Sequence, residues 1–245
     1  MTTNLRTVLI TGASSGIGLD VARGFLEKGS NVVLNARDIE KLTAAAKALG
    51  DESRIALVQG DIGDKETGEK MVKVAIDRFG SADVLVNNAG IFGVKPFLEN
   101  TEEDLDRYID INLKGTYFVT QAAVRQMKKQ GGGNIVNIGT VLVMHSAAGI
   151  PASAALITKG GVHALTTSLA SELAADKIRV NAVAPGVIRT PLYGGADVDA
   201  FGGIALLNRV GEVQEITEAV IYLATASFTT GVIMPVDGGF VYGRA

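Results

Sequence analysis

A glycine-rich segment near the start of the chain, residues 11–18 (TGASSGIG), has the residue types and spacing of a phosphate-binding loop. Gly12 permits a tight turn, Gly16 lets the backbone approach a pyrophosphate, and Gly18 lets a helix pack closely on a strand. A β-branched run precedes the loop and an amphipathic stretch follows it, so the N–H groups at a helix start would face the phosphates. The spacing predicts a dinucleotide-binding loop, with an ordinary glycine-rich turn as the alternative.

Small or polar residues follow six of the apolar runs along the chain. They are the glycine loop, Arg37, Asp61, Asn88-Ala89-Gly90, Gly139-Thr140 and Pro185-Gly186. Taken singly, each has the composition of an ordinary turn. Ligands of parallel α/β sheets bind at the carboxyl ends of the strands, and all six segments would meet there. The recurrence therefore favours a ligand site at that edge over six independent turns.

Apolar runs and the amphipathic stretches between them define the elements that must position these residues. Strands are expected at residues 7–10, 31–36, 54–59, 83–87, 134–138, 178–183 and 232–236. One helix is expected directly after the glycine loop and a second at 39–49, with Asp38 as its N-cap. A third helix is expected to end at 79–80, a fourth to span 102–129 with an irregularity near Gly115, and a fifth to span 156–175. This alternation predicts an α/β fold: a single doubly wound Rossmann domain over residues 1–245, with an about seven-stranded parallel sheet, helices on both faces and a substrate lid around 190–210.

The composition of the 245 residues argues against several classes of protein. Hydrophobic residues make up 47% and charged residues 20%, which argues against long disorder, and a net charge of −3 without a Lys/Arg cluster argues against nucleic-acid binding. Without cysteine, and with His145 and His163 too far apart for a helical metal pair, no metal site is expected. No apolar run reaches the roughly 18 residues of a membrane span. Residues 1–6 leave no room for a signal peptide, so a cytoplasmic protein is expected.

Five motifs in order along the chain resemble those of the short-chain dehydrogenase/reductase family, and of its 3-oxoacyl-ACP-reductase-like members in particular. Residues 11–18 match the TGxxxGxG loop, 87–90 the NNAG motif, Asn112 the helical asparagine, 180–186 with Thr190 the nicotinamide-side segment, and 235–239 the C-terminal signature. The resemblance covers nearly the whole chain. It implies a nicotinamide-dependent oxidoreductase that forms a homo-oligomer, a tetramer or a dimer. The apolar segment 230–242 predicts a subunit interface.

The resemblance also implies three catalytic positions, Asn112, Thr140 and Lys159. Family members reduce a carbonyl by hydride transfer from the nicotinamide while the tyrosine of a Tyr-x-x-x-Lys motif donates a proton. Lys159 matches the lysine of that motif, and Thr140 supplies the hydroxyl that polarises the carbonyl. Ala155 stands at the tyrosine position, where a methyl group cannot donate a proton.

Four replacements for the missing proton donor stay open. His145 lies in the segment that borders the substrate in the family, Tyr193 lies in the expected lid, and Ser153 lies two residues before Ala155, where it could instead be an N-cap. A water relayed through Lys159 is the simplest substitute. His163 and Tyr222 are expected to serve only helix packing.

Charge at the end of the second strand favours NADP(H) over NAD(H), which stays possible. An acidic residue there would repel a 2′-phosphate, whereas this chain has Ala36 followed by Arg37. Ser15 weakens the preference, because many NADP-binding relatives have a basic residue at that position. The residues expected to bind the cofactor are Gly12, Ser14, Ser15, Gly16, Ile17, Gly18, Arg37, Asp61, Ile62, Asn88, Ala89, Gly90, Lys159, Pro185, Gly186, Ile188 and Thr190, with Asp61 alternatively an N-cap.

The expected substrate region, residues 141–154 and 193–210, is apolar and rich in small residues. It favours interconversion of a small or apolar ketone or aldehyde and its alcohol, with an atypical proton donor. Two other hypotheses are a nucleotide-binding pseudoenzyme or regulatory subunit with little turnover, and a lyase or isomerase without net redox change. Cofactor binding without turnover would indicate the pseudoenzyme, and product without a change in nicotinamide absorbance would indicate the lyase or isomerase.

Overall fold

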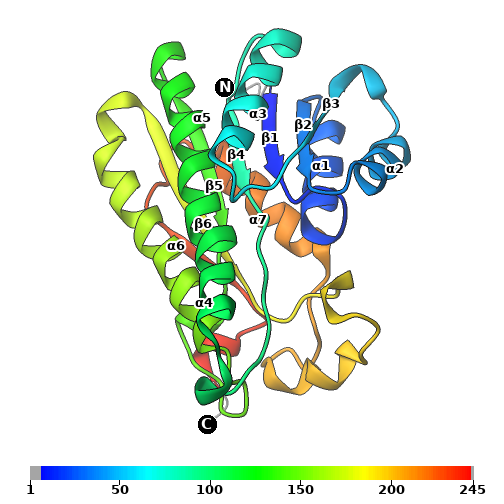
Figure 1. Ribbon diagram of the computed structural model, residues 1–245, viewed down its shortest axis with the longest axis vertical. Helices are drawn as coiled ribbons and strands as arrows, with labels where there is room; N and C mark the ends of the chain where they lie inside the picture. Colours follow the sequence, from blue (N-terminus) through cyan, green and yellow to red (C-terminus); the bar gives the residue numbers. More distant parts are fainter. Residues whose placement is uncertain (1–6, 244–245) are drawn as a thin grey trace.

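The computed structural model describes residues 7–243 as an α/β Rossmann-like domain, so the expectation for residues 1–6 lies outside the described part (Figure 1). Its seven strands form one parallel sheet in the order β3-β2-β1-β4-β5-β6-β7. They are β1 (Thr7–Thr11), β2 (Asn31–Ala36), β3 (Ile55–Gln59), β4 (Val84–Asn87), β5 (Gly133–Ile138), β6 (Ile178–Pro185) and β7 (Ile233–Val236). The prediction of a doubly wound parallel sheet is confirmed.

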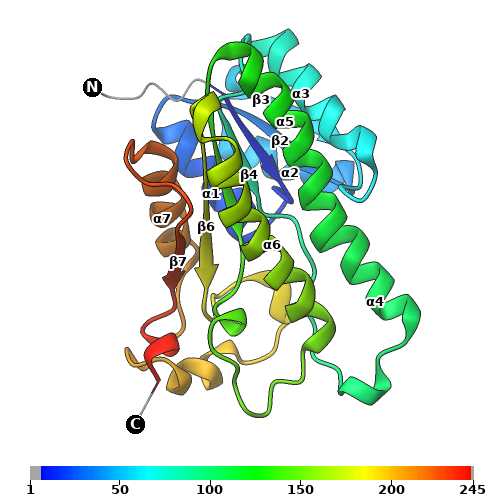
Figure 2. The ribbon, with the colours of Figure 1, turned by 90° about the vertical axis from the view of Figure 1, so that its left-hand side faces the viewer.

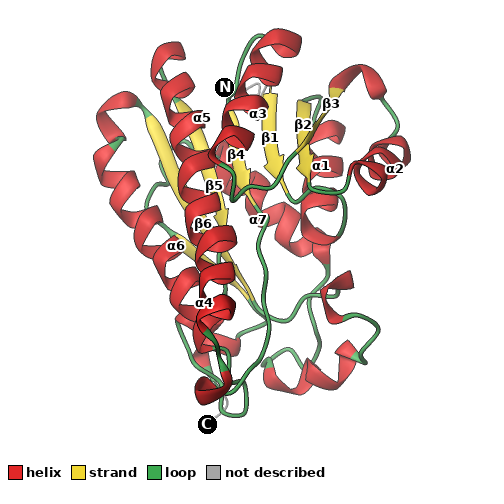
Figure 3. Ribbon diagram, viewed as in Figure 1, coloured by secondary structure: helices red, strands yellow, loops and turns green. Residues whose placement is uncertain are grey.

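Helices cover both faces of the sheet, as Figures 2 and 3 show. They are α1 (Gly16–Glu27), α2 (Ile39–Leu49), α3 (Lys65–Phe79), α4 (Glu102–Tyr108), α5 (Thr116–Gln130), α6 (Ser153–Glu172) and α7 (Val213–Thr225). Alternate residues of each strand point to opposite faces, so Val8 and Ile10 pack with α1, α2 and α7, whereas Leu9 packs with α3, α5 and α6. Two apolar layers therefore hold the strands rigidly and fix where their carboxyl ends meet.

A π-helical segment, Ile109–Gly115, joins α4 and α5. The irregularity expected near Gly115 is thus confirmed. A Cβ on Gly115 would lie 2.8 Å from the Ile62 side chain, so the glycine lets this helix approach the end of β3. A π segment shifts the helical register, and such segments gather at functional sites.

The structure confirms one expected N-cap, Asp38, and contradicts the N-cap alternatives for Ser153 and Asp61. Asp38 is the N-cap of α2, as expected, because its Oδ1 accepts from the Lys41 N–H at 3.1 Å. The N-cap alternative for Ser153 is wrong: α6 begins at Ser153 itself and ends at Glu172, since the backbone leaves the helical region already at Ala152. The N-cap alternative for Asp61 is also wrong, because α3 begins only at Lys65.

Candidate functional site

The glycine loop is fastened to the end of β4. The Asn88 Nδ2 donates to the carbonyl oxygens of Thr11 and Gly12, both at 3.0 Å. Gly12 has a φ of +66°, and a Cβ there would lie 2.8 Å from the Ala89 Cα. A Cβ on Gly18 would lie 2.4 Å from the Gly12 carbonyl oxygen. Only glycine fits at both positions, as the motif requires, and the loop is preformed at the N-terminus of α1.

The segment after β6 reaches the same loop. A Cβ on Gly16 would contact the Thr190 Cβ at 3.5 Å, and Ile188 is buried under this crossing. Gly186 packs against Asp237 beyond β7, where a Cβ would meet the Asp237 Cα at 2.8 Å. The predicted cofactor residues of the two chain segments therefore lie side by side. Ser14 and Ile17 in the glycine loop are half-buried, and Ser15 is exposed.

Asn112 is fully buried within the π segment and is held by three hydrogen bonds. Its Oδ1 accepts from the Ile91 N–H at 2.8 Å, and its Nδ2 donates to the Ile91 carbonyl at 2.9 Å and to the Thr158 Oγ1 at 3.1 Å. Asn112 thus ties the segment after Gly90 to α6.

Lys159 projects from α6 to the strand ends. Its Nζ donates to the Ile138 carbonyl at 2.8 Å. A Cβ on Gly90 would lie 3.1 Å from this Nζ and 3.0 Å from the Asn112 Oδ1, so the absence of a side chain at Gly90 lets the three meet. Burial of the ammonium lowers the pKa of Lys159 to about 8. An acid with that pKa can exchange protons near neutral pH.

Thr140 lies beside Lys159 at the end of β5. Its Oγ1 accepts from the Leu142 N–H at 3.3 Å, and its own N–H donates a long hydrogen bond, 3.5 Å, to the Nε2 of His163. His163 is buried, and burial followed by the nearby Lys159 charge lowers its pKa, which favours the neutral imidazole that can accept this bond. The expectation that His163 serves only helix packing missed this contact, although its position four residues after Lys159 places both on one face of α6.

The three residues considered as substitute acids have other surroundings than Lys159 and Thr140. His145 is exposed, with its ring edge-on to Phe240 at 5.5 Å between centroids. Ser153 is exposed at the start of α6, and the ring of Tyr193 packs against Phe201 in the lid at 6.2 Å. Burial raises the pKa of Tyr193. None of the three is hydrogen-bonded to Lys159 or Thr140 within residues 7–243.

Tyr108 is a site residue that sequence reasoning missed. A Cβ on Gly93 would lie 2.8 Å from its hydroxyl oxygen, so this phenol packs on the segment that Asn112 also binds. Its spacing of four residues from Asn112 was the available signal, because it places both side chains on one helix face.

Arg37 and Asp61 face each other across the ends of β2 and β3. The Arg37 guanidinium lies 3.8 Å from the Asp61 carboxylate, and Arg37 is exposed. The other Asp61 oxygen accepts from the Gly63 N–H at 2.9 Å, and Ile62 is buried against Gly115. The predicted adenosine-side residues are therefore brought together, with the positive charge toward solvent.

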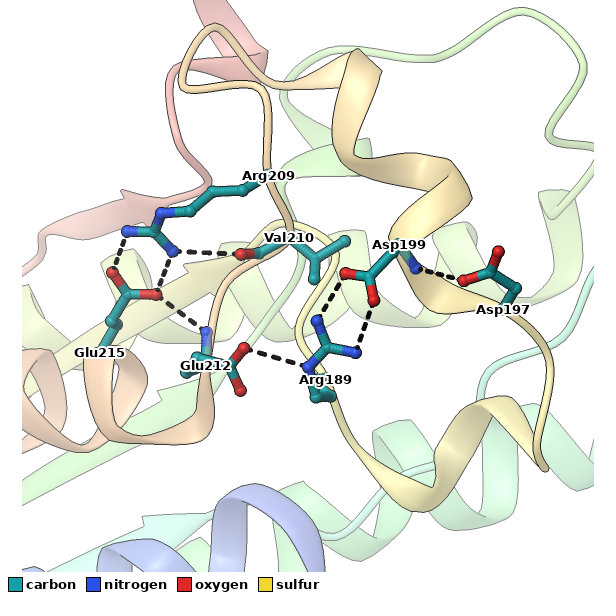
Figure 4. Close-up of polar contacts among 7 residues, drawn as sticks. All are labelled: Arg189, Asp197, Asp199, Arg209, Val210, Glu212 and Glu215. Atoms are coloured by element: carbon teal, nitrogen blue, oxygen red, sulfur yellow. Dashed lines mark hydrogen bonds and ion pairs between the residues drawn. The ribbon is translucent and has the colours of Figure 1, made fainter.

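Two arginines hold the segment predicted to be a substrate lid, around residues 190–210 (Figure 4). Arg189 directly precedes Thr190 and donates to both oxygens of Asp199, at 2.5 and 3.1 Å, and to Glu212 at 3.0 Å. Arg209 donates to both oxygens of Glu215, at 2.6 and 2.9 Å, and holds the pKa of that carboxyl at about 2. Asp199 thus links the middle of the segment to Arg189 after β6, and Arg209 links its far end to α7.

No group of three or more His, Cys, Asp or Glu side chains able to hold a metal occurs between residues 7 and 243. Over the same range no helix is long and apolar enough to cross a membrane.

Comparison with known proteins places this architecture in a family. A model of that family, described as short chain dehydrogenase, matches residues 6–198. The chain is 35% identical over 244 residues to a 3alpha-hydroxysteroid dehydrogenase of Mediterraneibacter gnavus, covering 95% of this chain and 96% of that protein. It is 37% identical over 243 residues to a 3-oxoacyl-[acyl-carrier-protein] reductase of Thermotoga maritima, covering 96% and 98%.

A crystal structure of a short-chain type dehydrogenase/reductase from Mycobacterium marinum has a TM-score of 0.91 to this chain at 34% identity, covering 96% of this chain and 95% of that one. Both the sequence and the fold therefore agree over almost the full length, and the relatives support an enzyme. This chain belongs to the short-chain dehydrogenase/reductase family, whose members are oxidoreductases that bind NAD(P)(H).

Proposed function

We propose that the protein is an NADP(H)-dependent oxidoreductase that interconverts a small or apolar ketone or aldehyde and its alcohol. The observation that carries this proposal is the meeting of Lys159, Asn112 and Gly90 at the end of β4, beside Thr140. The non-catalytic alternative is not favoured, because the relatives that align over the full length are named as a dehydrogenase and a reductase.

The residues at the strand ends fit a nicotinamide dinucleotide. Gly12, Gly18 and Gly90 let the loop, α1 and the segment after β4 pack closely there, because an added Cβ would meet Ala89, the Gly12 carbonyl oxygen or the Asn112 side chain. We assign the pyrophosphate to the glycine loop and the N-terminus of α1, and the nicotinamide end to the residues near Lys159 and Ile188. When bound, the reduced cofactor supplies a hydride to the carbonyl carbon. The exposed Arg37 supports a 2′-phosphate, since its only ion pair in the described residues is the long contact with Asp61.

The remaining task is to protonate the carbonyl oxygen. We assign Ala155 to the position where the family carries tyrosine, and Ala155 is buried four residues before Lys159. The Thr140 hydroxyl can polarise the oxygen by a hydrogen bond. As the carbon takes the hydride, the oxygen takes a proton from a water molecule, and that water recovers its proton from the Lys159 ammonium. The lowered pKa of Lys159 eases this transfer.

The first test compares NADPH oxidation by wild type, Lys159→Ala and Ala155→Tyr over a panel of ketones and aldehydes. We expect turnover by the wild type and its loss in Lys159→Ala, because no other described group is placed to return the proton. Ala155→Tyr should raise kcat by about 10²–10⁴-fold, the usual contribution of a placed general acid. Cofactor affinity, measured separately by fluorescence titration, identifies variants that fail only in binding.

Turnover confined to Ala155→Tyr would refute the proposal, because the scaffold would then be intact and the natural protein inactive. Unchanged turnover in Lys159→Ala would instead remove the site assignment. NAD(H) used better than NADP(H) would refute the assignment of Arg37.

A further inference from the structure

A cavity of about 200 Å³ lies between α4 and the segment after β4. Its walls are Gly90, Ile91, Phe92, Asp104, Arg107, Tyr108 and Leu192 of the lid. Because Gly90 also lies against Lys159 and Asn112, the cavity adjoins the centre where the proposed reaction takes place. Leu192 and Phe92 supply the apolar part of its wall.

Asp104 is the one carboxylate among the residues that line this cavity, and it forms an ion pair with Lys95. The Asp104 Oδ2 accepts from the Lys95 ammonium, from the Thr101 N–H at 3.0 Å and from the Thr101 hydroxyl at 3.1 Å. Lys95 and these bonds hold the pKa of Asp104 at about 2, so the carboxylate stays ionised and paired with Lys95. The cavity therefore carries no unpaired negative charge.

Arg107 is the charged residue of the cavity lining that has no ion-pair partner in the described chain. It is exposed, so it lies at the rim, and within the described chain its guanidinium has no ion pair, although Glu103 lies one helical turn before it. Arg107 presents N–H groups in the fork that suits two carboxylate oxygens. The cavity thus has a net positive side.

Tyr108 provides a second donor inside the cavity. It is half-buried, and its hydroxyl makes no hydrogen bond to another group in residues 7–243. Gly93 makes room for this hydroxyl, because a Cβ there would lie 2.8 Å from it. A half-buried phenol without a protein partner beside a cavity is placed to bind an oxygen of a ligand.

We propose that this cavity binds the carboxylate of the substrate, with Arg107 as its ion-pair partner and Tyr108 as its hydrogen-bond donor. The inference rests on the proposed oxidoreductase function and narrows its substrate class to small, otherwise apolar keto acids and hydroxy acids. The side-chain donors without a protein partner in the described cavity lining are the Arg107 guanidinium and the Tyr108 hydroxyl, which match the single charge and two oxygens of a carboxylate.

The test compares 4-acetylbenzoate with its methyl ester and with 4-acetylphenyl phosphate, which share one ketone. Initial rates of NADPH oxidation are measured with wild type, Arg107→Ala, Tyr108→Phe and Gly93→Ala. In wild type we expect kcat/KM for the acid to exceed that for the ester by about tenfold or more, the effect of a charge-assisted hydrogen bond at a partly exposed site. Arg107→Ala should abolish this preference by lowering kcat/KM for the acid to about that for the ester.

Tyr108→Phe and Gly93→Ala should each reduce the preference for the acid severalfold, the second by displacing the hydroxyl. Arg125→Ala is the matched control, since Arg125 pairs with Glu69 on the surface of α3 and α5 and should leave both rates unchanged. Equal rates for acid and ester in wild type would overturn the inference while leaving the oxidoreductase in place. Preference for the phosphate, or weaker NADPH binding in Arg107→Ala, would also overturn it.

If no ketone turns over, the proposed function fails and a binding measurement still decides the inference. Titration of the NADP⁺-loaded protein with benzoate by calorimetry should then give a heat signal that Arg107→Ala abolishes. Equal binding by wild type and Arg107→Ala would overturn the assignment of the cavity.

Discussion

At the scale of single residues, the site depends on where Lys159 places its charge. Its ammonium donates to the Ile138 carbonyl and is half-buried, so water stabilises it less than at the surface. His163 contributes from the next helical turn by accepting the Thr140 N–H, which holds the strand end that carries the Thr140 hydroxyl. A lysine in this position can serve both as a cofactor contact and as a proton reservoir.

We therefore expect carbonyl reduction and alcohol oxidation to respond to pH in opposite directions. Reduction consumes a proton, so it requires the ammonium, and the pKa of Lys159 is lowered from 10.5 to about 8. The reduction rate should be constant below that pKa and fall as pH rises through it, whereas oxidation should rise there. Initial rates between about pH 6 and about pH 10 measure both limbs. A common direction for both, or a reduction rate that holds to pH 10, would contradict the role of Lys159.

At the scale of elements, glycines decide how closely the helices approach their neighbours. Gly68 of α3 is buried against α5, where a Cβ would lie 2.8 Å from the Val119 Cα and 3.3 Å from the Ala122 Cβ. Gly160 of α6 has more room, with the Val143 Cγ1 at 3.8 Å from an added Cβ. Both are helix-interior positions, so an alanine gains the same helical propensity at each and only packing differs.

This contrast predicts opposite changes in stability. Gly160→Ala should raise the free energy of unfolding by about 0.5–1 kcal/mol, because alanine restricts the unfolded chain more than glycine does. Gly68→Ala should lower it by about 1–3 kcal/mol, because backbone on α5 has to shift to admit the methyl group. Urea titrations followed by circular dichroism measure both. A stabilised Gly68→Ala would show that the α3–α5 contact has room for a methyl group.

At the scale of the whole molecule, the chain exposes apolar side chains near its C-terminal strand. Phe228 is fully exposed, Tyr242 is 83% exposed and Val232 is 37% exposed. These residues lie in or next to the segment for which a subunit interface is predicted. Exposed apolar surface of this kind commonly marks a contact between chains.

We expect the protein to sediment as a dimer or tetramer at micromolar concentration. Replacing both Phe228 and Tyr242 by serine should shift it toward smaller species if this surface forms the contact, with little change in the circular dichroism of the subunit. Sedimentation velocity of the two proteins side by side makes the comparison. A monomeric wild type would contradict the oligomer prediction, and an unchanged double variant would move the contact elsewhere.

The sequence by itself determined the fold and the outline of the candidate site. Continuous apolar runs and helical periodicity are local properties, so the strands, most helix bounds and the irregularity near Gly115 were predictable from neighbouring residues. The mechanical roles of Gly12 and Gly18 followed from the same local reasoning and are confirmed by the space around them. Helix starts were predicted less accurately, since the cap at Asp38 is confirmed and the one at Ser153 is wrong.

Only the tertiary structure decided which distant side chains meet. Gly90, Asn112 and Lys159 come from three elements, and their contact depends on the exact approach of α6 and the π segment to the end of β4. The same packing places His163 beneath Thr140 and the Tyr108 hydroxyl on Gly93. Contacts of this kind depend on side-chain volumes summed over whole layers, which no local pattern encodes. The physical chemistry of the site is therefore set by packing between elements, and its location by the sequence.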